Sequence, residues 1–303
     1  MTLTKFAKFS WGVVAWTILV ILWGAMVRAT GSGAGCGNHW PTCNGDVIHR
    51  PEAVETFIEL THRATSGIAL LLVLALLIWA FKAYPKGHII RKGAVGTAAF
   101  ILIEALLGAG LVLLELVGDN DSVHRAIAMA VHLLNTFLLL GVMTMTAWWA
   151  SGGRRITFKG KGLWPLWFIL GLAGVTVIGM TGAITALGDT LFPPESLVEG
   201  LAQKSDPNAH FLIQLRIVHP LVAILVGFMT LVLVRNLYEK IDKPLTRLLS
   251  LSLAGLVLIQ WFAGLVNVIL LAPVWMQLLH LLLADLIWIV YVLLAADVLS
   301  VEA

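Results

Sequence analysis

The dominant pattern along the chain is a succession of long apolar stretches separated by short polar connections. A helix needs about 20 consecutive apolar residues to cross the core of a bilayer, and each stretch reaches that length. The apolar positions run on without a two-residue alternation, so the pattern favours membrane helices over the strands of a barrel. Eight spans are predicted, over residues 9–29, 60–82, 93–117, 124–150, 163–186, 211–235, 246–270 and 276–298.

Composition supports an all-α integral membrane protein. Of the 303 residues 59% are hydrophobic and 12% are charged, and the mean hydropathy is +0.92. A soluble domain is excluded, because water would have to cover mostly hydrocarbon. The first span follows Lys5 and Lys8 and resembles a signal peptide, but it lacks a small-residue cleavage site at the right distance. We therefore expect a retained helix.

The distribution of cations predicts the orientation in the membrane. The N-terminus and the second, fourth and sixth connections hold 14 of the 20 Lys and Arg residues. The positive-inside rule then places both termini in the cytoplasm. The pI of 9.0 is explained by this cytoplasmic fringe facing anionic membrane lipid, so no nucleic-acid partner is expected.

The two cysteines of the chain, Cys36 and Cys43, lie in the first outer connection. Disulfides persist outside the cytoplasm, so a Cys36–Cys43 bridge is predicted. It would stabilise this short loop by roughly 2–3 kcal/mol on the chain-entropy estimate. Metal binding by Cys36, His39 and Cys43 is the alternative, and it leaves one ligand missing.

The third outer connection, 187–210, is long and acidic. Residues 194–201 within it have the apolar spacing of a short helix lying at the membrane interface. Four histidines fall in loops and are expected to face solvent, while His124 is expected at the interface. The loop histidines are His39, His49, His88 and His210.

The two halves of the chain resemble each other. Four groups of residues recur with offsets between 148 and 158. Four helices per half preserve the orientation, so the pattern predicts a parallel repeat of two similar four-helix bundles, residues 1–155 and 156–303. The matching groups are Gly24-Ala25 with Gly182-Ala183, His62 with His219, Leu102-Ile103-Glu104 and Gly108 with Leu258-Ile259-Gln260 and Gly264, and His132 with His280.

Four histidines, His62, His132, His219 and His280, each lie alone on an even-numbered span. Each falls in the first part of its span, which predicts a common depth near the outer face. A single buried histidine is more often hydrogen-bonded across helices. A repeated set of four favours ligation instead, and paired imidazoles across a bundle suit a planar ligand such as haem.

Glu59 is the main difference between the halves. Its spacing places Glu59, His62 and Arg63 on one helical face. The carboxylate is a candidate partner of a ligand histidine, a candidate proton acceptor, or an ion-pair partner of Arg63. Arg216 stands at the corresponding place in the second half. We therefore interpret the first half as chemically active and the second as the holder of a permanent cofactor.

Other charged residues have two interpretations each. Four arginines are expected near the outer face, where they would contact haem propionates or lipid headgroups. Glu104 and Asp285, deeper in their spans, would serve a proton path or be packed polar residues. The four arginines are Arg28, Arg63, Arg125 and Arg216.

These features resemble haem A synthase. The resemblance covers almost the whole chain and includes the duplicated eight-span layout and a glycine-rich run that leads through Trp40-Pro41 to Cys43. The motifs are Gly31-Ser32-Gly33-Ala34-Gly35-Cys36-Gly37 and Glu59-Leu60-Thr61-His62-Arg63.

The resemblance implies an oxidoreductase of the bacterial cell (inner) membrane whose active face is extracytoplasmic. It would oxidise the C8 methyl of haem O to the formyl group of haem A by successive hydroxylations, for cytochrome oxidase biogenesis. His62 and His132 would hold the substrate haem, with its methyl edge near the catalytic Glu59. His219 and His280 would hold the iron of a haem b cofactor. A haem O synthase and an electron acceptor are candidate partners.

The sequence departs from the family pattern at two places. Many bacterial members carry a second cysteine pair in the third outer loop, and residues 187–210 contain none. Pro220 follows His219 where an arginine often stands. These differences concern the second outer surface and the cofactor contacts, not the reaction class.

Two other readings compete with the enzyme. A one-sided b-type electron-transfer cytochrome would bind haem without a substrate. Quinol-linked cytochromes usually stack haems at both faces from two histidines on one helix, a pattern that this chain lacks. A transporter built on the repeat would have helices broken at the midplane, with Gly108 and Gly264 as candidate interruptions.

Overall fold

The computed structural model describes residues 3–46, 50–51 and 53–301; His49 therefore lies outside the described residues. Within these ranges the regular structure is helical, apart from two isolated β-bridges. Eight of the described spans are long and apolar enough to cross a membrane, as predicted. They are α1 (Lys5–Ala29), α2 (Val54–Ala83), α3 (Ile89–Leu113), α4 (Val123–Ala150), α5 (Trp164–Leu191), Phe211–Lys240, α9 (Pro244–Ile269) and α10 (Val274–Leu299).

Several helix starts are fixed by side-chain caps. The Thr4 hydroxyl accepts a hydrogen bond from the backbone N–H of Ala7 at 3.1 Å before α1. The Ser122 hydroxyl accepts one from Arg125 at 3.3 Å before α4. Each cap satisfies a donor that has no partner within its helix. Polar residues at these positions therefore set where the apolar helices begin.

The third span ends earlier than the predicted residue 117. Helix α3 stops at Leu113, and Glu115 and Gly118 then adopt positive φ angles of 54° and 61°. A left-handed residue cannot continue a right-handed helix. Apolar residues beyond Leu113 therefore belong to the connection to α4, not to the span.

The sixth span is interrupted near its start. It consists of α7 (Phe211–Gln214), the 3₁₀ turn η2 (Leu215–Ile217) and α8 (Val218–Lys240). Pro220 lies in the first turn of α8, where the missing N–H would have no intrahelical partner in any case. Gly108 and Gly264, by contrast, lie inside the continuous helices α3 and α9. The described residues thus lack the midplane breaks that the transporter reading requires.

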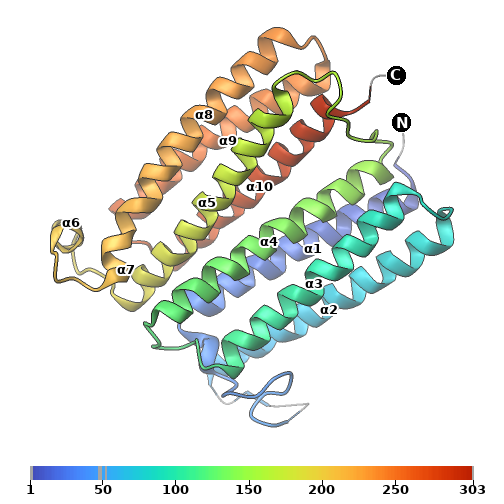
Figure 1. Ribbon diagram of the computed structural model, residues 1–303. Helices are drawn as coiled ribbons and strands as arrows, with labels where there is room; N and C mark the ends of the chain where they lie inside the picture. Colours follow the sequence, from blue (N-terminus) through green and yellow to red (C-terminus); the bar gives the residue numbers. More distant parts are fainter. Residues whose placement is uncertain (1–2, 47–49, 52, 302–303) are drawn as a thin grey trace.

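The helices form two groups of four. Helices α1 to α4 pack each on the next, and α4 also packs on α1; α5, α8, α9 and α10 are connected in the same way. The groups meet where α1 and α4 pack against α5 and α10 (Figure 1). This contact is built around aromatic rings, since Phe137 of α4 stacks on Trp288 of α10 with centroids 5.0 Å apart. The repeat symmetry and the orientation in the membrane stay predictions.

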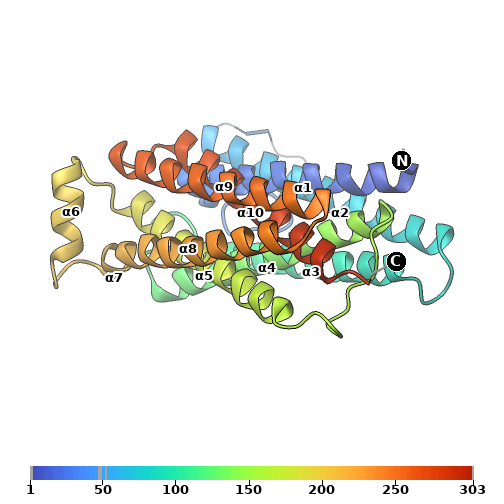
Figure 2. The same ribbon diagram turned by 90° about the horizontal axis from the view of Figure 1, so that it is seen from above.

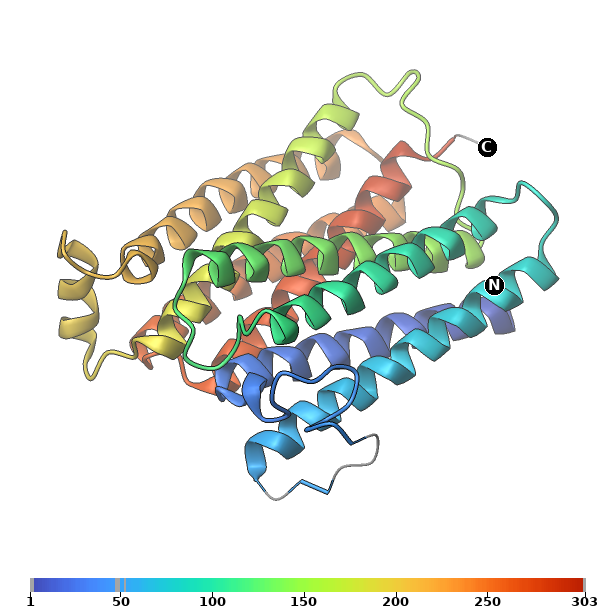
Figure 3. The same cartoon turned by 60° about the horizontal axis from the view of Figure 1, so that its bottom comes forward.

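The two ends of the bundle differ in what they carry. Both chain termini lie at one end (Figure 1), where a bridge joins Ile156 to Ser300. The opposite end carries the connection between α1 and α2, which lies across the start of α2 (Figure 3). The short helix predicted over residues 194–201 is present as α6 (Leu197–Ser205), and it stands apart from the long helices at that end (Figure 2).

Candidate functional site

The four repeated histidines lie in the first turns of spans that begin at the end of the bundle opposite the termini (Figure 1). They are the ninth, tenth, ninth and seventh residues of the spans that begin at Val54, Val123, Phe211 and Val274. Each therefore lies within about three turns of the start of its span.

Glycines on neighbouring helices leave room for three of the imidazole rings. A Cβ atom added at Gly24 would lie 3.0 Å from Cε1 of His62, and one at Gly182 would lie 3.0 Å from Cε1 of His219. Gly264 faces His280 in the same way at 3.3 Å, whereas a Cβ at Gly108 would meet nothing within 4 Å. The contact of Gly24 with His62 thus recurs in the second half as that of Gly182 with His219, whereas the contact of Gly264 with His280 has no counterpart at Gly108.

His219 and His280 form a pair across the second group of helices. Their ring centroids lie 6.2 Å apart and their planes are inclined by 76°. Nδ1 of His219 lies 3.1 Å from the carbonyl oxygen of Ile178. A carbonyl can only accept, so Nδ1 is the donor and Nε2 stays available as a metal ligand. Nδ1 of His280 is buried without a hydrogen-bond partner.

His62 of α2 and His132 of α4 are the two repeated histidines of the first group. Nδ1 of His62 is buried and has no hydrogen-bond partner. Nδ1 of His132 likewise has no hydrogen-bond partner, and it lies 3.5 Å from Oε1 of Glu104 of α3. The structure therefore places a carboxylate against one of these two rings.

Glu59 is buried, with 3% of its surface exposed. Its Oε2 accepts a hydrogen bond from the backbone N–H of Cys36 at 2.7 Å. Its Oε1 accepts from the guanidinium group of Arg63, one turn further along α2. The predicted ion pair with Arg63 is therefore present, and the carboxylate also holds the loop between α1 and α2.

That loop is closed by a disulfide between Cys36 and Cys43, as predicted. The sulfur atoms are bonded to each other, which removes the alternative of a metal site formed by Cys36, His39 and Cys43. Within the described residues no group of three or more His, Cys, Asp or Glu side chains could hold a metal ion. A haem needs only axial ligands from the protein, so this finding does not bear on paired histidines.

Close packing fixes the loop against α2. A Cβ atom on Gly35 would lie 2.6 Å from the carbonyl carbon of Glu55. The Thr56 hydroxyl donates to the carbonyl oxygen of Gly35 at 2.8 Å, and Nη1 of Arg63 donates to the carbonyl of His39 at 2.7 Å. The loop therefore packs closely over the start of α2, next to the turn that carries His62.

The four arginines predicted near the outer end are engaged with protein groups. Arg28 of α1 donates to the carbonyl of Ala186 and the hydroxyl of Thr190, each at 2.8 Å, and to Oε1 of Gln277 at 2.7 Å. It therefore connects the first group of helices to α5 and α10 of the second.

Arg125 and Arg216 bind loop carbonyls. Arg125 donates to Gly118 and Asn120 at 2.6 and 2.7 Å. Arg216 donates to Gly188 and Phe192 at 2.8 and 2.7 Å and pairs with Asp189 at 2.8 Å. These guanidinium groups, like that of Arg63, tie connections to helix ends, a role that the sequence-based interpretations did not include.

Some polar residues at the site were missed or differ from expectation. Gln260 lies 3.2 Å from Nε2 of His280, and Asn135 and Thr136 both donate to Glu104. The sequence indicated Gln260 only as the repeat partner of Glu104. That correspondence is the signal in the sequence that could have identified Gln260 as a neighbour of His280. Asp285 is fully buried, and neither carboxylate oxygen has a hydrogen-bond partner.

The loop histidines also differ from expectation. His210 was expected in solvent but caps α7 and lies between Phe192 and Phe211. His88 similarly caps α3, its Nδ1 accepting from the N–H of Ile90 at 3.2 Å. Both side chains are therefore partly buried by the helix ends that they cap.

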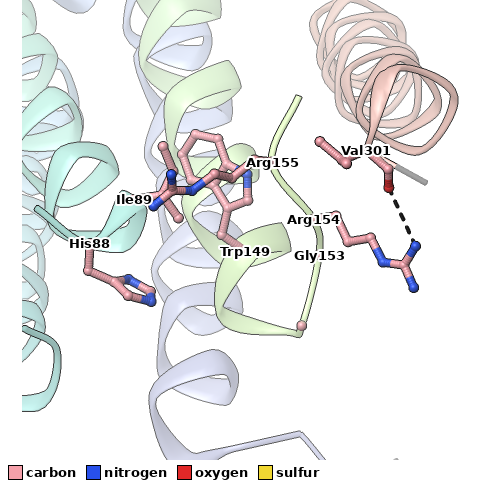
Figure 4. A pocket seen from close by; sticks show the side chains of 8 residues that line it. His88, Ile89, Trp149, Gly153, Arg154, Arg155 and Val301 are labelled. Atoms are coloured by element: carbon pink, nitrogen blue, oxygen red, sulfur yellow. Dashed lines mark hydrogen bonds between the residues drawn. The ribbon is translucent and has the colours of Figure 1, made fainter. Parts of the chain in front are cut away.

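An open pocket lies far from the four repeated histidines. It has a volume of about 470 Å³, lies at the end that carries the termini and is lined by residues including His88, Trp149, Arg154 and Arg155. In Figure 4 the Arg154 side chain turns toward the carbonyl of Val301. This pocket lies at the opposite end of α4 from His132, so it is separate from the candidate site.

Fold and site together define an eight-span membrane protein with a lone histidine on each of four spans, of which His219 and His280 face each other. The chain matches the sequence model of the COX15-CtaA family, described as cytochrome oxidase assembly protein, over residues 7–292. It therefore belongs to that family, and the resemblance to haem A synthases is confirmed.

Individual relatives agree in part. A protein of Thermus thermophilus named protoheme IX farnesyltransferase is 52% identical over 297 residues, which are 98% of this chain and 49% of the relative. The heme A synthase of Exiguobacterium sp. is 42% identical over 109 residues, 36% of each chain. That of Alkalihalophilus pseudofirmus is 37% identical over 147 residues, 48% of this chain and 46% of the relative. The chain thus spans about half the length of the first of these relatives.

Proposed function

We propose that the protein is a haem A synthase that oxidises the C8 methyl of haem O to the formyl group of haem A. The observation that carries the proposal is the presence of a buried carboxylate, Glu59, one turn before His62 in one half only. Membership of the family supports it. In this proposal the substrate haem lies between His62 and His132, and the site faces the extracytoplasmic side.

The second pair of histidines fits a bound haem b. Two imidazoles on one metal have ring centres about 6 Å apart, since each metal–nitrogen bond is about 2 Å and each centre lies about 1 Å behind its nitrogen. The centroids of His219 and His280 are separated by 6.2 Å. Gly182 and Gly264 leave space beside these rings. When bound there, haem b supplies a one-electron acceptor for the reaction.

Residues of the chain itself prepare the first half. Arg63 and the N–H of Cys36 hold Glu59 with one oxygen each, so the carboxylate is fixed relative to the turn that carries His62. The covering loop keeps it from bulk water, as its exposure of 3% requires. A carboxylate held in this way is suited to accept a proton or to orient water as the methyl carbon is oxidised.

The Thermus relative supports a haem O synthase as a partner. Its name describes farnesyl transfer to protoheme IX, the reaction class that supplies a farnesylated haem, and the match covers only about half of its length. In our proposal the matched half performs the later oxidation. A protein that makes the substrate would then act next to this chain in the membrane.

The proposal is tested by extracting pigments from membranes that contain the protein and a supply of haem O. Wild-type protein is expected to yield haem A, and Glu59→Gln is expected to abolish conversion. Glu55→Gln is the matched control, because Glu55 is an exposed acid on the same helix. Unchanged conversion by Glu59→Gln would remove its catalytic role.

The same pigment assay separates the enzyme from the one-sided cytochrome. A carrier would retain haem b and form no haem A under any supply of substrate. Histidine variants distinguish the proposed roles of the two halves. His219→Ala and His280→Ala are expected to lose haem b, whereas His62→Ala and His132→Ala are expected to retain it and lose conversion.

A further inference from the structure

Glu104 of α3 lies at the centre of a small polar cluster beside His132. Asn135 donates to one of its carboxylate oxygens and Thr136 to the other. Oε1 also lies 3.5 Å from Nδ1 of His132. Asn135 and Thr136 lie three and four residues after His132 on α4, so the next turn on the same face of the helix provides the groups that hold the carboxylate.

The corresponding place in the second half carries an amide. Gln260 of α9 is the repeat partner of Glu104, and its Nε2 lies 3.2 Å from Nε2 of His280 and 3.1 Å from the His280 carbonyl oxygen. Both halves therefore place a side chain of the same length against the histidine of the next span, Glu104 at Nδ1 of His132 and Gln260 at Nε2 of His280. The two side chains differ by one charge.

That difference has an electronic consequence for a metal-bound imidazole. A carboxylate beside the ring of a ligand histidine places negative charge near the metal, and negative charge stabilises the higher oxidation state of iron. A neutral amide has a much weaker effect. If both histidines bind haem, iron on the Glu104 side is therefore held at the lower reduction potential.

We propose that Glu104 is a positioning residue for His132 and that the Glu104/Gln260 difference sets the order of reduction potentials between the two haem sites. The inference rests on the proposed function, since it requires haem on both histidine pairs. Electrons would then pass favourably from the first half, where substrate is oxidised, to the second. The alternative is that Glu104 only connects α3 to α4 by hydrogen bonds. That role predicts no shift in the reduction potential of the haem when Glu104 is changed.

The test is a redox titration of the purified haem-containing protein, followed at the haem absorption bands. His280→Ala is used to assign the bands of the first-half haem. Glu104→Gln is expected to shift the first-half potential in the positive direction. Gln260→Glu is expected to shift the haem b potential in the negative direction. Thr136→Val is the control, because it removes a donor from the same cluster and leaves the charge, and we expect less than half the shift of Glu104→Gln.

The outcomes are distinguishable. Potentials that stay at the wild-type values in Glu104→Gln and Gln260→Glu, with haem still bound, overturn the inference and leave the proposed function standing. Wild-type protein that binds no haem overturns both. If Glu104→Gln loses its haem, Gln260→Glu decides the question in the other half, where a negative shift supports the inference and an unchanged potential overturns it.

Discussion

Glu59 and Cys36 lie 23 residues apart in the sequence and are joined by a hydrogen bond of 2.7 Å from the Cys36 backbone N–H to Oε2. The disulfide loop and the acid proposed for catalysis are therefore one structural unit. A change in the loop reaches Glu59 through this bond and through Arg63, which donates to both Glu59 and the His39 carbonyl, and a change at Glu59 removes an anchor of the loop.

Removal of the disulfide tests this connection. The double variant Cys36→Ser, Cys43→Ser is expected to unfold more easily, by roughly 2–3 kcal/mol on the chain-entropy estimate, and to convert less haem O because the Cys36 N–H is less firmly placed. Thermal unfolding in detergent and pigment extraction measure the two effects. Reductant should reproduce them in wild-type protein and have no effect on the variant; wild-type conversion by the variant would show that the loop need not be closed.

Gly35→Ala probes the fit of the loop on α2. The added Cβ would lie 2.6 Å from a backbone carbon of Glu55, so the loop has to move away, at roughly 1–3 kcal/mol. We expect lower thermal stability and lower conversion, with haem b content unchanged. Gly12→Ala is the control, since nothing lies within 4 Å of its added Cβ. Equal behaviour of the two variants would contradict the packing argument.

Alanine at the ring-facing glycines is expected to separate the two haem sites. Gly182→Ala crowds His219 and should lower the haem b content of purified protein, whereas Gly24→Ala crowds His62 and should reduce conversion with haem b retained. Both contacts are 3.0 Å from a ring carbon. Gly108→Ala, which meets nothing within 4 Å, should change neither. Haem-to-protein ratios measured for the three variants decide this, and a uniform loss would argue against separate sites.

Arg28→Ala removes three hydrogen bonds between the two groups of helices. A hydrogen bond to a charged group contributes about 1.5–3 kcal/mol, so we expect a loss of roughly 2–4 kcal/mol after partial compensation. Thermal unfolding in detergent measures it. Arg154→Ala, whose exposed side chain makes one hydrogen bond of 3.4 Å, should cost much less; equal losses would mean that Arg28 is not a connection between the halves.

The spans, the disulfide and the histidine positions could be predicted because each depends on local sequence. Apolar length defines a span, and two cysteines in one short loop leave one pairing. The end of α3 could not be predicted, since the residue that adopts the left-handed conformation there is Glu115 and not a glycine. The partners of Arg28, Arg125 and Arg216 could not either. They are mostly backbone carbonyls, and carbonyls have no signature in a sequence.

The contacts of Glu104 and Gln260 could be predicted in part. Their equivalence was visible in the repeat, because Leu102-Ile103-Glu104 matches Leu258-Ile259-Gln260 with an offset of 156. The contact with the ring was not, since it depends on how α3 packs on α4 and α9 on α10. The repeat thus indicated that Glu104 and Gln260 correspond. The structure shows that each contacts a histidine, which makes the difference in their charge relevant.

Arg28 also bears on how the protein is made. Its acceptors lie 158, 162 and 249 residues further along the chain, so all of them are synthesised long after Arg28, and the last of them belongs to α10. Until α10 is inserted, the first helix carries a guanidinium group without its final partner at a membrane boundary. We therefore expect maturation to be completed late, with a chain truncated before α10 retained by the insertion machinery or degraded instead of accumulating as a stable half-protein.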